Sequence, residues 1–409
     1  MNVRTPRNPS ESNRLANRLA VERIVAAEPV LVGCERASSA LGLGEGELGH
    51  AGPPFSDYTR IPPAVLNALT GAAIHERWAD TREKARSMIE RGEIKLRSNH
   101  DLGTVSPMAG VVRPSQTVMR IENRSGDGVT YATLAEAGRL VLRFGFYDDS
   151  VAAGLDYLDR VVGPAIEKAL PAGGLAVLPC IASGVALGDD IHQRNIGGMF
   201  DFVRKLTSLD NAVRAWLLDN PQHFLNYAMA SAKLALDRAR DVPGSSIVTA
   251  ISRNGSMCGV RMAGTGNQWF TAPATTPDGE FFAPHTRADA QADLGDSAIM
   301  EAYGLGGAIA HCAPELAKRM RQDWTSASET GVRMRALFEA SHPTIVPALA
   351  GESGVGLGLD AYKVVAADEP IRIHTGIAHR DGATGWIGVG VATAPVACFE
   401  SAIEALNAP

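Results

Sequence analysis

The segment GDDIHQRNIGG, residues 188–198, concentrates side chains that can perform acid–base chemistry. The residues that follow it have apolar positions at helical spacing, so the segment is predicted to be helical. Asp189, His192 and Asn195 then lie three residues apart and share one face of the helix. A carboxylate beside a histidine fixes the tautomer of the ring and raises its basicity. This face is therefore a candidate acid–base site in which Asp189 orients His192.

Other residues of the same segment have a structural explanation. Asp190 and Arg194 are four residues apart, and a solvent-exposed pair at this spacing stabilises a helix by only about 0.3 to 0.5 kcal/mol. The consecutive glycines Gly197 and Gly198 each cost about 0.5 to 1 kcal/mol relative to alanine inside a helix. Such glycines are tolerated where another group approaches the backbone closely. Both a functional site and a close helix crossing are therefore open explanations.

Two further polar segments are candidates for carrying chemistry. His100 lies in NHDLGTVSPMAG, residues 99–110, which is predicted to be a polar loop after a strand. Local hydrogen bonds between side chains and backbone would explain the same composition. Asp293 and Asp296 lie at the start of a predicted helix over residues 296–320, where N-capping alone would account for them.

The segment RIHTGIAHRDGATGWIGVG, residues 372–390, joins two predicted strands and is rich in glycine. Arg380, Thr375 and the backbone N–H groups of a glycine loop are donors that suit a carboxylate or phosphate. His374 and His379 lie five residues apart without a third ligand, so no metal site is predicted. The segment is therefore a candidate site for a small anion.

Composition and missing motifs exclude several classes of protein. The 409 residues carry a net charge of −6, which provides no positive field for nucleic acid. GxSxG, HExxH and CxxC motifs are absent, and no glycine loop has the full pattern of a dinucleotide or P-loop site, so no cofactor is predicted. Five widely spaced cysteines, with no signal peptide and no apolar run of about eighteen residues, predict a cytoplasmic protein that does not contact a membrane.

The elements that must position these residues follow from periodicity and turn signals. Asn254-Gly255, between two apolar runs, is the strongest hairpin signal of the chain. Helices are predicted within residues 13–29, 62–93, 224–242, 326–342 and 394–408. Strands are predicted at residues 30–34, within residues 245–264 and on either side of the turn RSGDG, residues 124–128.

Helices and strands mixed in this way predict an α/β fold with several lobes. A chain of this length is expected to contain two or three domains. We predict an N-terminal α/β lobe over residues 1–150 and a mainly helical region over residues 151–244. A C-terminal α/β lobe rich in glycine loops is predicted over residues 245–409.

Eight blocks occur in order along the chain. They are HAGPP (50–54), PMAG (107–110), GDDIHQRN (188–195), SSIVTAISRNG (245–255), QWFTAPA (268–274), DLGDSAIMEAYGLGG (293–307), TGIAHRDGATGWIGVG (375–390) and APVACFE (394–400). This ordered set resembles the YlbE/YahG-like family from about Asn17 to the C-terminus. That family includes the large subunit of oxamate carbamoyltransferase, which interconverts oxalurate and phosphate with oxamate and carbamoyl phosphate in anaerobic allantoin breakdown.

The resemblance implies a subunit of a carbamoyltransferase in ureide and purine catabolism. It makes His192 the candidate acid–base residue, oriented by Asp189. It also makes three arginines candidates for binding phosphate or a substrate carboxylate, namely Arg194, Arg253 and Arg380. Asn195 or Asn254 would hold the ureido or amide group, and further candidates for substrate binding are His100, Thr375 and His379.

Partners are implied in the same way. The substrates would be carbamoyl phosphate and a small amide or carboxylate, and the assembly would be an oligomer with an FdrA-like subunit and a small third subunit. Alternatively, His192 and Asp189 would activate water in a hydrolase or lyase acting on a related ureide or amide. A third hypothesis is a non-catalytic subunit that binds a small anion and leaves the chemistry to its partner.

Overall fold

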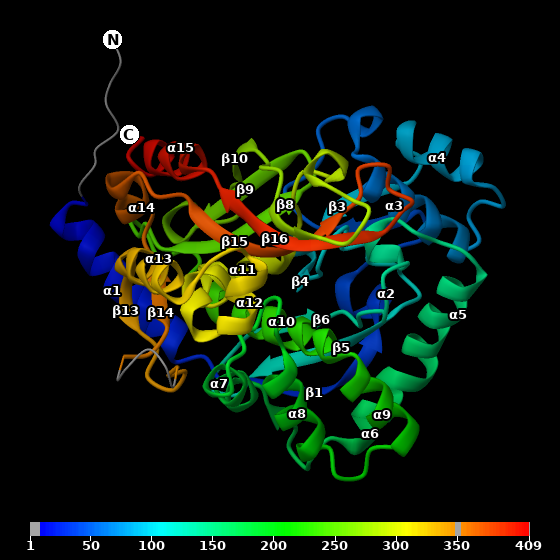
Figure 1. The fold of residues 1–409 in the computed structure, drawn as a ribbon, viewed down its shortest axis with the longest axis horizontal. Coiled ribbons are helices and arrows are strands. Elements are labelled where there is room, and N and C mark those ends of the chain that lie inside the picture. The colour runs from blue at the N-terminus through cyan, green and yellow to red at the C-terminus, as the bar shows by residue number, and fades with distance from the viewer. Residues whose placement is uncertain (1–8, 348–352, 409) are drawn as a thin grey trace.

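The computed structural model describes residues 9–347 and 353–408, and its fold is mixed α/β, as predicted (Figure 1). The helices are α1 Glu11–Val25, α2 Ala37–Leu41, α3 Pro63–His75, α4 Arg82–Glu90, α5 Asp149–Tyr157, α6 Gly163–Ala169, α7 Leu178–Ala186, α8 Ile196–Lys205, α9 Asn211–Asp219, α10 Phe224–Asp237, α11 Ile299–Ala302, α12 Pro314–Arg319, α13 Trp324–Ala336, α14 Ala361–Ala367 and α15 Val396–Leu406. In this described part of the chain, none of the helices is long and apolar enough to span a membrane.

The strands form three larger sheets, in the orders β4-β6-β5-β1-β7, β10-β9-β8-β12 and β11-β16-β15, and two pairs, β13–β14 and β2–β3. Their bounds are β1 Pro29–Arg36, β2 Glu47–His50, β3 Lys95–Ser98, β4 Thr104–Val105, β5 Thr117–Asn123, β6 Val129–Ala132, β7 Leu175–Ala176, β8 Val248–Asn254, β9 Met257–Met262, β10 Phe270–Pro273, β11 Asp278–Phe281, β12 Leu294–Gly295, β13 Phe338–Ser341, β14 Gly356–Leu359, β15 Ile371–Ala378 and β16 Trp386–Ala394. The strands beside RSGDG are the antiparallel pair β5–β6, and Asn254-Gly255 joins the antiparallel pair β8–β9. Both predictions are confirmed.

Helix α10 lies at the centre of the molecule (Figure 1). All of its residues from Phe224 to Leu236 are buried, and it contacts β4, β5 and β6 of one sheet and β8 of another. A helix enclosed on all sides forms a core rather than a surface. The largest apolar cluster includes Leu31, Phe224 and Phe399, so it draws on all three predicted parts of the chain. The predicted boundaries near residues 150 and 244 stay a prediction.

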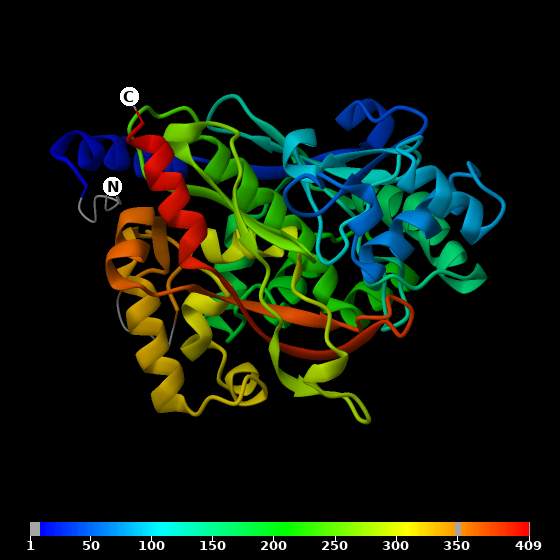
Figure 2. The same ribbon diagram turned by 90° about the horizontal axis from the view of Figure 1, so that it is seen from above.

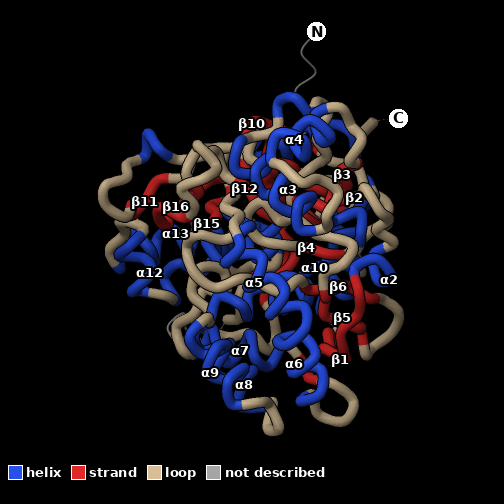
Figure 3. Tube along the Cα trace, turned by 90° about the vertical axis from the view of Figure 1, so that its right-hand side faces the viewer, coloured by secondary structure: helices blue, strands red, loops and turns tan. Residues whose placement is uncertain are grey.

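The peripheral elements lie at opposite ends of this core. Helices α6 to α9 gather at one end, and α3 and α4 lie at the other (Figure 3). The long β15–β16 hairpin runs across the molecule (Figure 2). Its turn reaches α3, where the side-chain amide of Asn67 donates a hydrogen bond of 3.0 Å to the carbonyl of Gly382. The hairpin therefore brings the C-terminal part of the chain against the N-terminal part.

The predicted helix over residues 296–320 is wrong in its middle. Only α11 and α12 are α-helical there, and residues 306–312 form 3₁₀ turns. Gly304 has φ +81°, and a Cβ at this position would lie 1.9 Å from the carbonyl oxygen of Gly356. The backbone turns at this glycine because β14 approaches it closely, and a continuous helix would prevent that contact.

Candidate functional site

The loop before α8 is not helical, contrary to the prediction. Gly188 has φ +89° and Ile191 has φ +57°, conformations that no α-helix accommodates. Helix α8 begins only after Asn195. The predicted shared helical face of Asp189, His192 and Asn195 is therefore wrong, and each side chain has its own environment.

Asp189 is buried and holds the start of α8. Its carboxylate accepts hydrogen bonds from the backbone N–H groups of Ile196 (3.1 Å) and Gly198 (2.9 Å). Arg194 places its Nε 3.5 Å from Oδ1 of Asp189, and its side chain is 35% exposed. The predicted surface pair of Asp190 with Arg194 is therefore wrong, because the partner of Arg194 is Asp189.

Burial raises the pKa of Asp189 to about 6, and the hydrogen bond from Gly198 only partly offsets this. The ordinary pKa of this carboxyl group is 3.8. Between about pH 4 and pH 6, Asp189 therefore stays protonated in the folded protein, whereas in the unfolded chain it has lost its proton. The free energy of unfolding should therefore fall as the pH rises through this window, by at most about 1.4 kcal/mol per pH unit from this group.

Asp189→Asn should remove this part of the pH dependence. Urea unfolding of both proteins at pH 4, 5, 6 and 7 measures it. Asp149→Asn, on the exposed first turn of α5, is the control. If the free energy of unfolding of Asp189→Asn falls with pH as steeply as that of the wild type, Asp189 does not titrate between pH 4 and pH 6.

The orienting carboxylate of His192 is Glu301. The Nδ1 atom of His192 lies 2.8 and 2.9 Å from the two carboxylate oxygens of Glu301, and both side chains are buried. Glu301 also accepts hydrogen bonds from the backbone N–H groups of Gly307 (2.9 Å) and His374 (3.1 Å). A proton on Nδ1 donated to Glu301 leaves the lone pair on Nε2. The assignment of Asp189 as the orienting residue is therefore corrected.

A second histidine–carboxylate pair lies beside the first. The Nδ1 atom of His374 is 2.6 Å from Oδ2 of Asp190, and both residues are inaccessible to solvent. Oδ1 of Asp190 accepts hydrogen bonds from the backbone N–H groups of His192, Gln193 and Arg194. Burial by itself would raise the pKa of Asp190, but the hydrogen bond from His374 and these further contacts hold it below its ordinary value.

The two pairs are interlocked, and we call them the histidine–carboxylate cluster: His192, Glu301, His374 and Asp190. Each carboxylate binds one imidazole and also accepts the backbone N–H of the other histidine. Both Nε2 atoms are buried and have no hydrogen-bond partner within residues 9–347 and 353–408. The cluster thus presents two oriented imidazoles that can accept or donate a proton. In the described residues, no group of three or more His, Cys, Asp or Glu side chains is arranged to hold a metal ion.

Glycines next to the cluster make its packing possible. A Cβ at Gly306 would lie 2.0 Å from Oε1 of Glu301, so a larger residue would displace the carboxylate. A Cβ at Gly198 would lie 2.6 Å from the ring of Phe224, and one at Gly197 would lie 2.9 Å from Cβ of Leu187. The glycine pair of α8 is therefore explained by close packing against α10 and the end of α7.

The 293–307 block also positions a second polar group around Asp296. This carboxylate is buried and accepts four hydrogen bonds, from Gly52 N (3.0 Å), Asn99 Nδ2 (2.9 Å), Ser106 N (3.0 Å) and Ser252 Oγ (2.6 Å). Burial raises its pKa, although these hydrogen bonds oppose the shift. Asp296 thus joins four separate segments, and N-capping does not account for it.

His100 lies next to Asp296 but forms no hydrogen bond with it. Its Nε2 is 3.7 Å from Oδ1 of Asp296, and its ring meets Trp269 edge to face. Burial lowers the pKa of His100 well below its ordinary value, and the positive charges of Lys233 and Arg261 lower it further. His100 is therefore neutral at physiological pH.

Arg253 is engaged in the interior. Its Nε lies 2.7 Å from Oδ2 of Asp293, whose other oxygen accepts a hydrogen bond of 2.8 Å from Thr375. Asn254 closes the β8–β9 turn, and its amide donates to the carbonyl of Pro53. A role of these residues in binding substrate stays a prediction.

The predicted cluster in residues 372–390 is divided between two places. His374 and Thr375 lie buried within β15, whereas His379 and Arg380 lie in the hairpin turn. His379 contacts Asp381, and Arg380 is exposed. Five residues of strand separate His374 from His379 by about 16 Å. These side chains therefore do not form a single anion site.

Arg194 connects the cluster to the surface. It lines a groove of about 430 Å³ together with Leu187, Gly188, Cys312 and Glu315. Its backbone N–H donates to Asp190, so the same residue contacts the buried cluster and the groove. A small anion in this groove would meet the guanidinium of Arg194, whose backbone N–H contacts the buried cluster.

Sequence reasoning did not identify Glu301, Asp190 and His374 as members of the site. All three lie in segments singled out for their polar residues, but local spacing assigned Asp190 to the surface and left Glu301 without a partner. The sequence separations are 109 residues for His192–Glu301 and 184 residues for His374–Asp190. No helical or strand period relates residues so far apart.

Comparisons with known proteins found similarity along nearly the whole chain. The family model described as "Oxamate carbamoyltransferase subunit AllG" matches residues 94–297. A protein of Escherichia coli (strain K12) named "Oxamate carbamoyltransferase subunit AllG" is 35% identical over 407 residues, which covers 96% of this chain and 97% of that protein. The "Uncharacterized protein YahG" of the same strain is 31% identical, with 95% and 84% covered. The crystal structure of a conserved protein of unknown function from Enterococcus faecalis V583 has a TM-score of 0.92 and 31% identity, covering 98% of this chain and 99% of that chain.

Proposed function

The chain belongs to the YlbE/YahG-like family of AllG and YahG, and from this premise we propose that it is a subunit of an oxamate carbamoyltransferase-like enzyme. The similarity to AllG along 96% of the chain carries this proposal. The reaction would interconvert oxamate and carbamoyl phosphate with oxalurate and phosphate in ureide catabolism. The complex would work in the cytoplasm.

Carbamoyl transfer to an amide requires a base. In the direction of oxalurate synthesis, the amide nitrogen of oxamate attacks the carbamoyl carbon, the bond from that carbon to the phosphate oxygen breaks, and the amide nitrogen loses one proton. The Nε2 atom of His192 would accept this proton. Glu301 would stabilise the imidazolium that forms, because its carboxylate already contacts Nδ1 of the ring.

The substrates also need donors and acceptors that orient them. Arg194 would bind the phosphate that leaves, because its partly exposed guanidinium lines the groove beside the cluster. Asn195 would orient the amide nucleophile. Its Nδ2 donates to the carbonyl of His192 and to Gln222, whereas its buried Oδ1 has no partner in the described chain and can accept an N–H of the substrate.

Other subunits would complete the enzyme. An FdrA-like chain and a small third subunit are the expected partners, and the groove with Arg194 would lie near the shared active site. Because the imidazoles of the cluster are buried, the partner chain or the substrate would have to open this region for chemistry. The isolated chain is therefore expected to have little or no turnover.

Affinity purification of the tagged chain from its own cells, with its associated subunits, provides the enzyme for a test. Phosphate released from carbamoyl phosphate is measured with and without oxamate, and oxalurate is detected by mass spectrometry. Oxamate-dependent release with formation of oxalurate is the expected result. Hydrolysis of oxalurate without phosphate would instead support the hydrolase hypothesis and overturn the transferase.

A further inference from the structure

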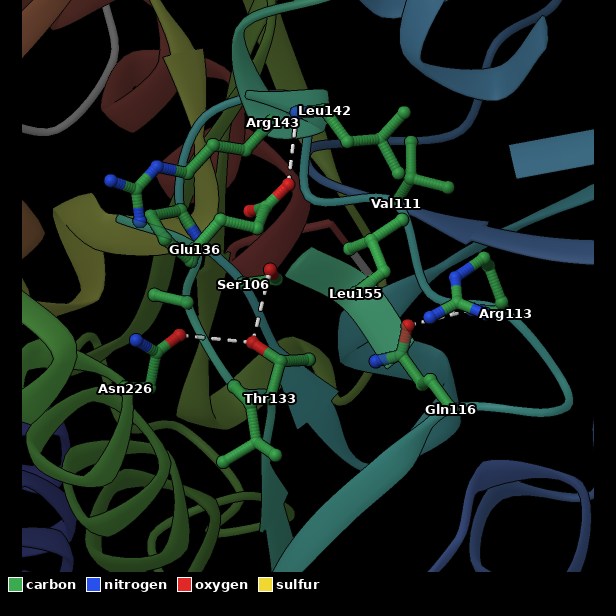
Figure 4. Close-up of a pocket in the computed structure, with 13 residues that line it drawn as sticks. Ser106, Val111, Arg113, Gln116, Thr133, Glu136, Leu142, Arg143, Leu155 and Asn226 are labelled. Carbon is green, nitrogen blue, oxygen red and sulfur yellow. Dashed lines mark hydrogen bonds between the residues drawn. The ribbon is translucent and has the colours of Figure 1, made fainter. Parts of the chain in front are cut away.

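A cavity distinct from the groove at Arg194 lies between β6, the 105–113 segment and α10 (Figure 4). Its empty volume of about 400 Å³ includes space that is open to solvent. One wall carries uncharged polar groups, from Ser106, Thr133 and Asn226, and the other carries the charged side chains of Arg143 and Glu136. Apolar side chains, among them Leu155, complete the lining.

The two arginines of the cavity differ in whether their charge is compensated. Arg113 is buried and forms ion pairs with Asp159 (2.9 Å) and Glu76 (3.2 Å). The guanidinium of Arg143 has no hydrogen bond or ion pair to any part of residues 9–347 and 353–408, and its Cζ lies 5.6 Å from the ring centroid of Phe144. Arg143 is partly exposed, whereas Arg113 is buried and paired, so the unpaired guanidinium of Arg143 is free to bind an anion in the cavity.

Glu136 lies close to Arg143 but does not neutralise it by contact. Its Oε1 accepts a hydrogen bond of 2.9 Å from the backbone N–H of Leu142. Partial burial lowers the pKa of Arg143, and the negative charge of Glu136 opposes this shift. A second negative charge on a ligand would be repelled by Glu136, so the charge balance favours a monoanion over a phosphate dianion.

The opposite wall can bind an uncharged polar end of the same ligand. Oγ1 of Thr133 lies 2.9 Å from Oδ1 of Asn226 and 3.1 Å from Oγ of Ser106. One hydroxyl proton cannot serve both contacts, so Thr133 donates to Asn226 while Ser106 donates to Thr133, which leaves the hydroxyl oxygen of Ser106 able to accept an N–H of a ligand. An acceptor of this kind recognises an amide group.

We propose that this cavity binds a small carboxylate monoanion with an amide end, the carboxylate on Arg143 and the amide on the Ser106–Thr133 wall. Its identity as oxamate rests on the proposed function. Neither His192 nor Asn195 lines this cavity, so it would hold the carbamoyl acceptor before its amide reaches the histidine–carboxylate cluster, and the groove at Arg194 would hold the phosphate.

The cavity is structurally joined to the histidine–carboxylate cluster. Ser106 exchanges two backbone hydrogen bonds with Asp296, its N–H donating to the carboxylate and its carbonyl accepting the N–H. Asp296 precedes Glu301 by five residues on the same segment. On the other side, Gln222 donates to the carbonyl of His192 at 2.6 Å, and the next residue, His223, contacts the carbonyl of the cavity residue Ala135. An occupied cavity would therefore lie against both segments that position His192.

Isothermal titration of the full chain with oxamate tests the site. Arg143→Gln should weaken binding about 10- to 100-fold, because a charge-assisted pair of hydrogen bonds is lost. Arg143→Lys should have an intermediate effect, because a lysine keeps the charge without the planar fork. Arg86→Gln, whose arginine is exposed on α4 and pairs with Glu90, should bind like the wild type.

Thermal melts separate loss of binding from loss of folding. Because the side chain of Arg143 makes no hydrogen bond with the described chain, Arg143→Gln should melt no lower than the wild type. Oxamide and inorganic phosphate are titrated in parallel, and neither should show binding that depends on Arg143. Phosphate binding that is lost in Arg143→Gln, or oxamate binding that is lost only in Arg194→Gln, would overturn the proposed site.

The KM for oxamate in the purified complex separates this proposal from the proposed function. A raised KM in Arg143→Gln supports both. Carbamoyl transfer with an unchanged KM would leave the function intact and overturn the cavity site. Oxamate binding that requires Arg143, in a complex without carbamoyl transfer, would keep the site and reject the function.

Discussion

Replacing His192 with alanine is expected to lower the turnover of the assembled complex by about 10²- to 10⁴-fold, the usual contribution of a positioned acid–base residue. The reason is that Nε2 of His192 would take the proton from the attacking amide, while Glu301 holds the ring through Nδ1. The kcat for oxamate-dependent phosphate release, measured at saturating substrates, reports this loss. Thermal melts show whether the variant folds.

Because removal of His192 leaves Glu301 buried without its imidazole, a second variant is needed. His192→Gln keeps a hydrogen-bonding group of similar size and should lose activity as strongly, with a smaller loss of stability. Glu301→Gln tests the positioning role and should shift the pH profile of kcat, which a purely structural contact would not do. His75→Ala, on α3, is the matched histidine control.

The third hypothesis, a non-catalytic subunit, makes the opposite prediction. If His192→Ala and His192→Gln assemble normally and turn over at a rate near that of the wild type, the acid–base role is wrong. The chemistry would then belong to the partner chain, and this subunit would only bind an anion. Replacing His374 in the same assay distinguishes which of the two imidazoles is required.

Asp296→Ala is expected to lower the free energy of unfolding by about 4 kcal/mol or more. The carboxylate accepts four hydrogen bonds in a region inaccessible to solvent, and its removal leaves donors from four segments without a partner. Asp296→Asn keeps one acceptor oxygen and should lower the free energy of unfolding by less than Asp296→Ala does. Urea unfolding monitored by circular dichroism measures the difference.

A matched control is available at the surface. Asp210 caps α9 by accepting hydrogen bonds from the N–H groups of Ala212 and Val213, and Asp210→Ala should cost about 1 kcal/mol. If Asp296→Ala destabilises the protein no more than Asp210→Ala does, the carboxylate of Asp296 is not a structural centre. The four hydrogen bonds that hold the Asp296 carboxylate would then have to be explained by a functional role.

The predicted elements that proved correct depend on interactions between residues close in sequence. The β8–β9 hairpin follows from Asn254-Gly255, and α10 follows from a long run of helix-forming residues. The predicted helix over residues 296–320 failed because β14 approaches Gly304, a contact with a residue about fifty positions away. Helical spacing alone cannot report such a contact.

The sequence by itself determined the mixed α/β class, most long helices and hairpins, and the segments in which the polar residues of the site lie. Tertiary structure alone decided the partners: Glu301 rather than Asp189 orients His192, and Asp189 rather than Asp190 pairs with Arg194. Hydrogen bonds of a buried side chain are made to whatever group folding brings beside it. For His192 that group comes from a segment 109 residues away, which no local period encodes.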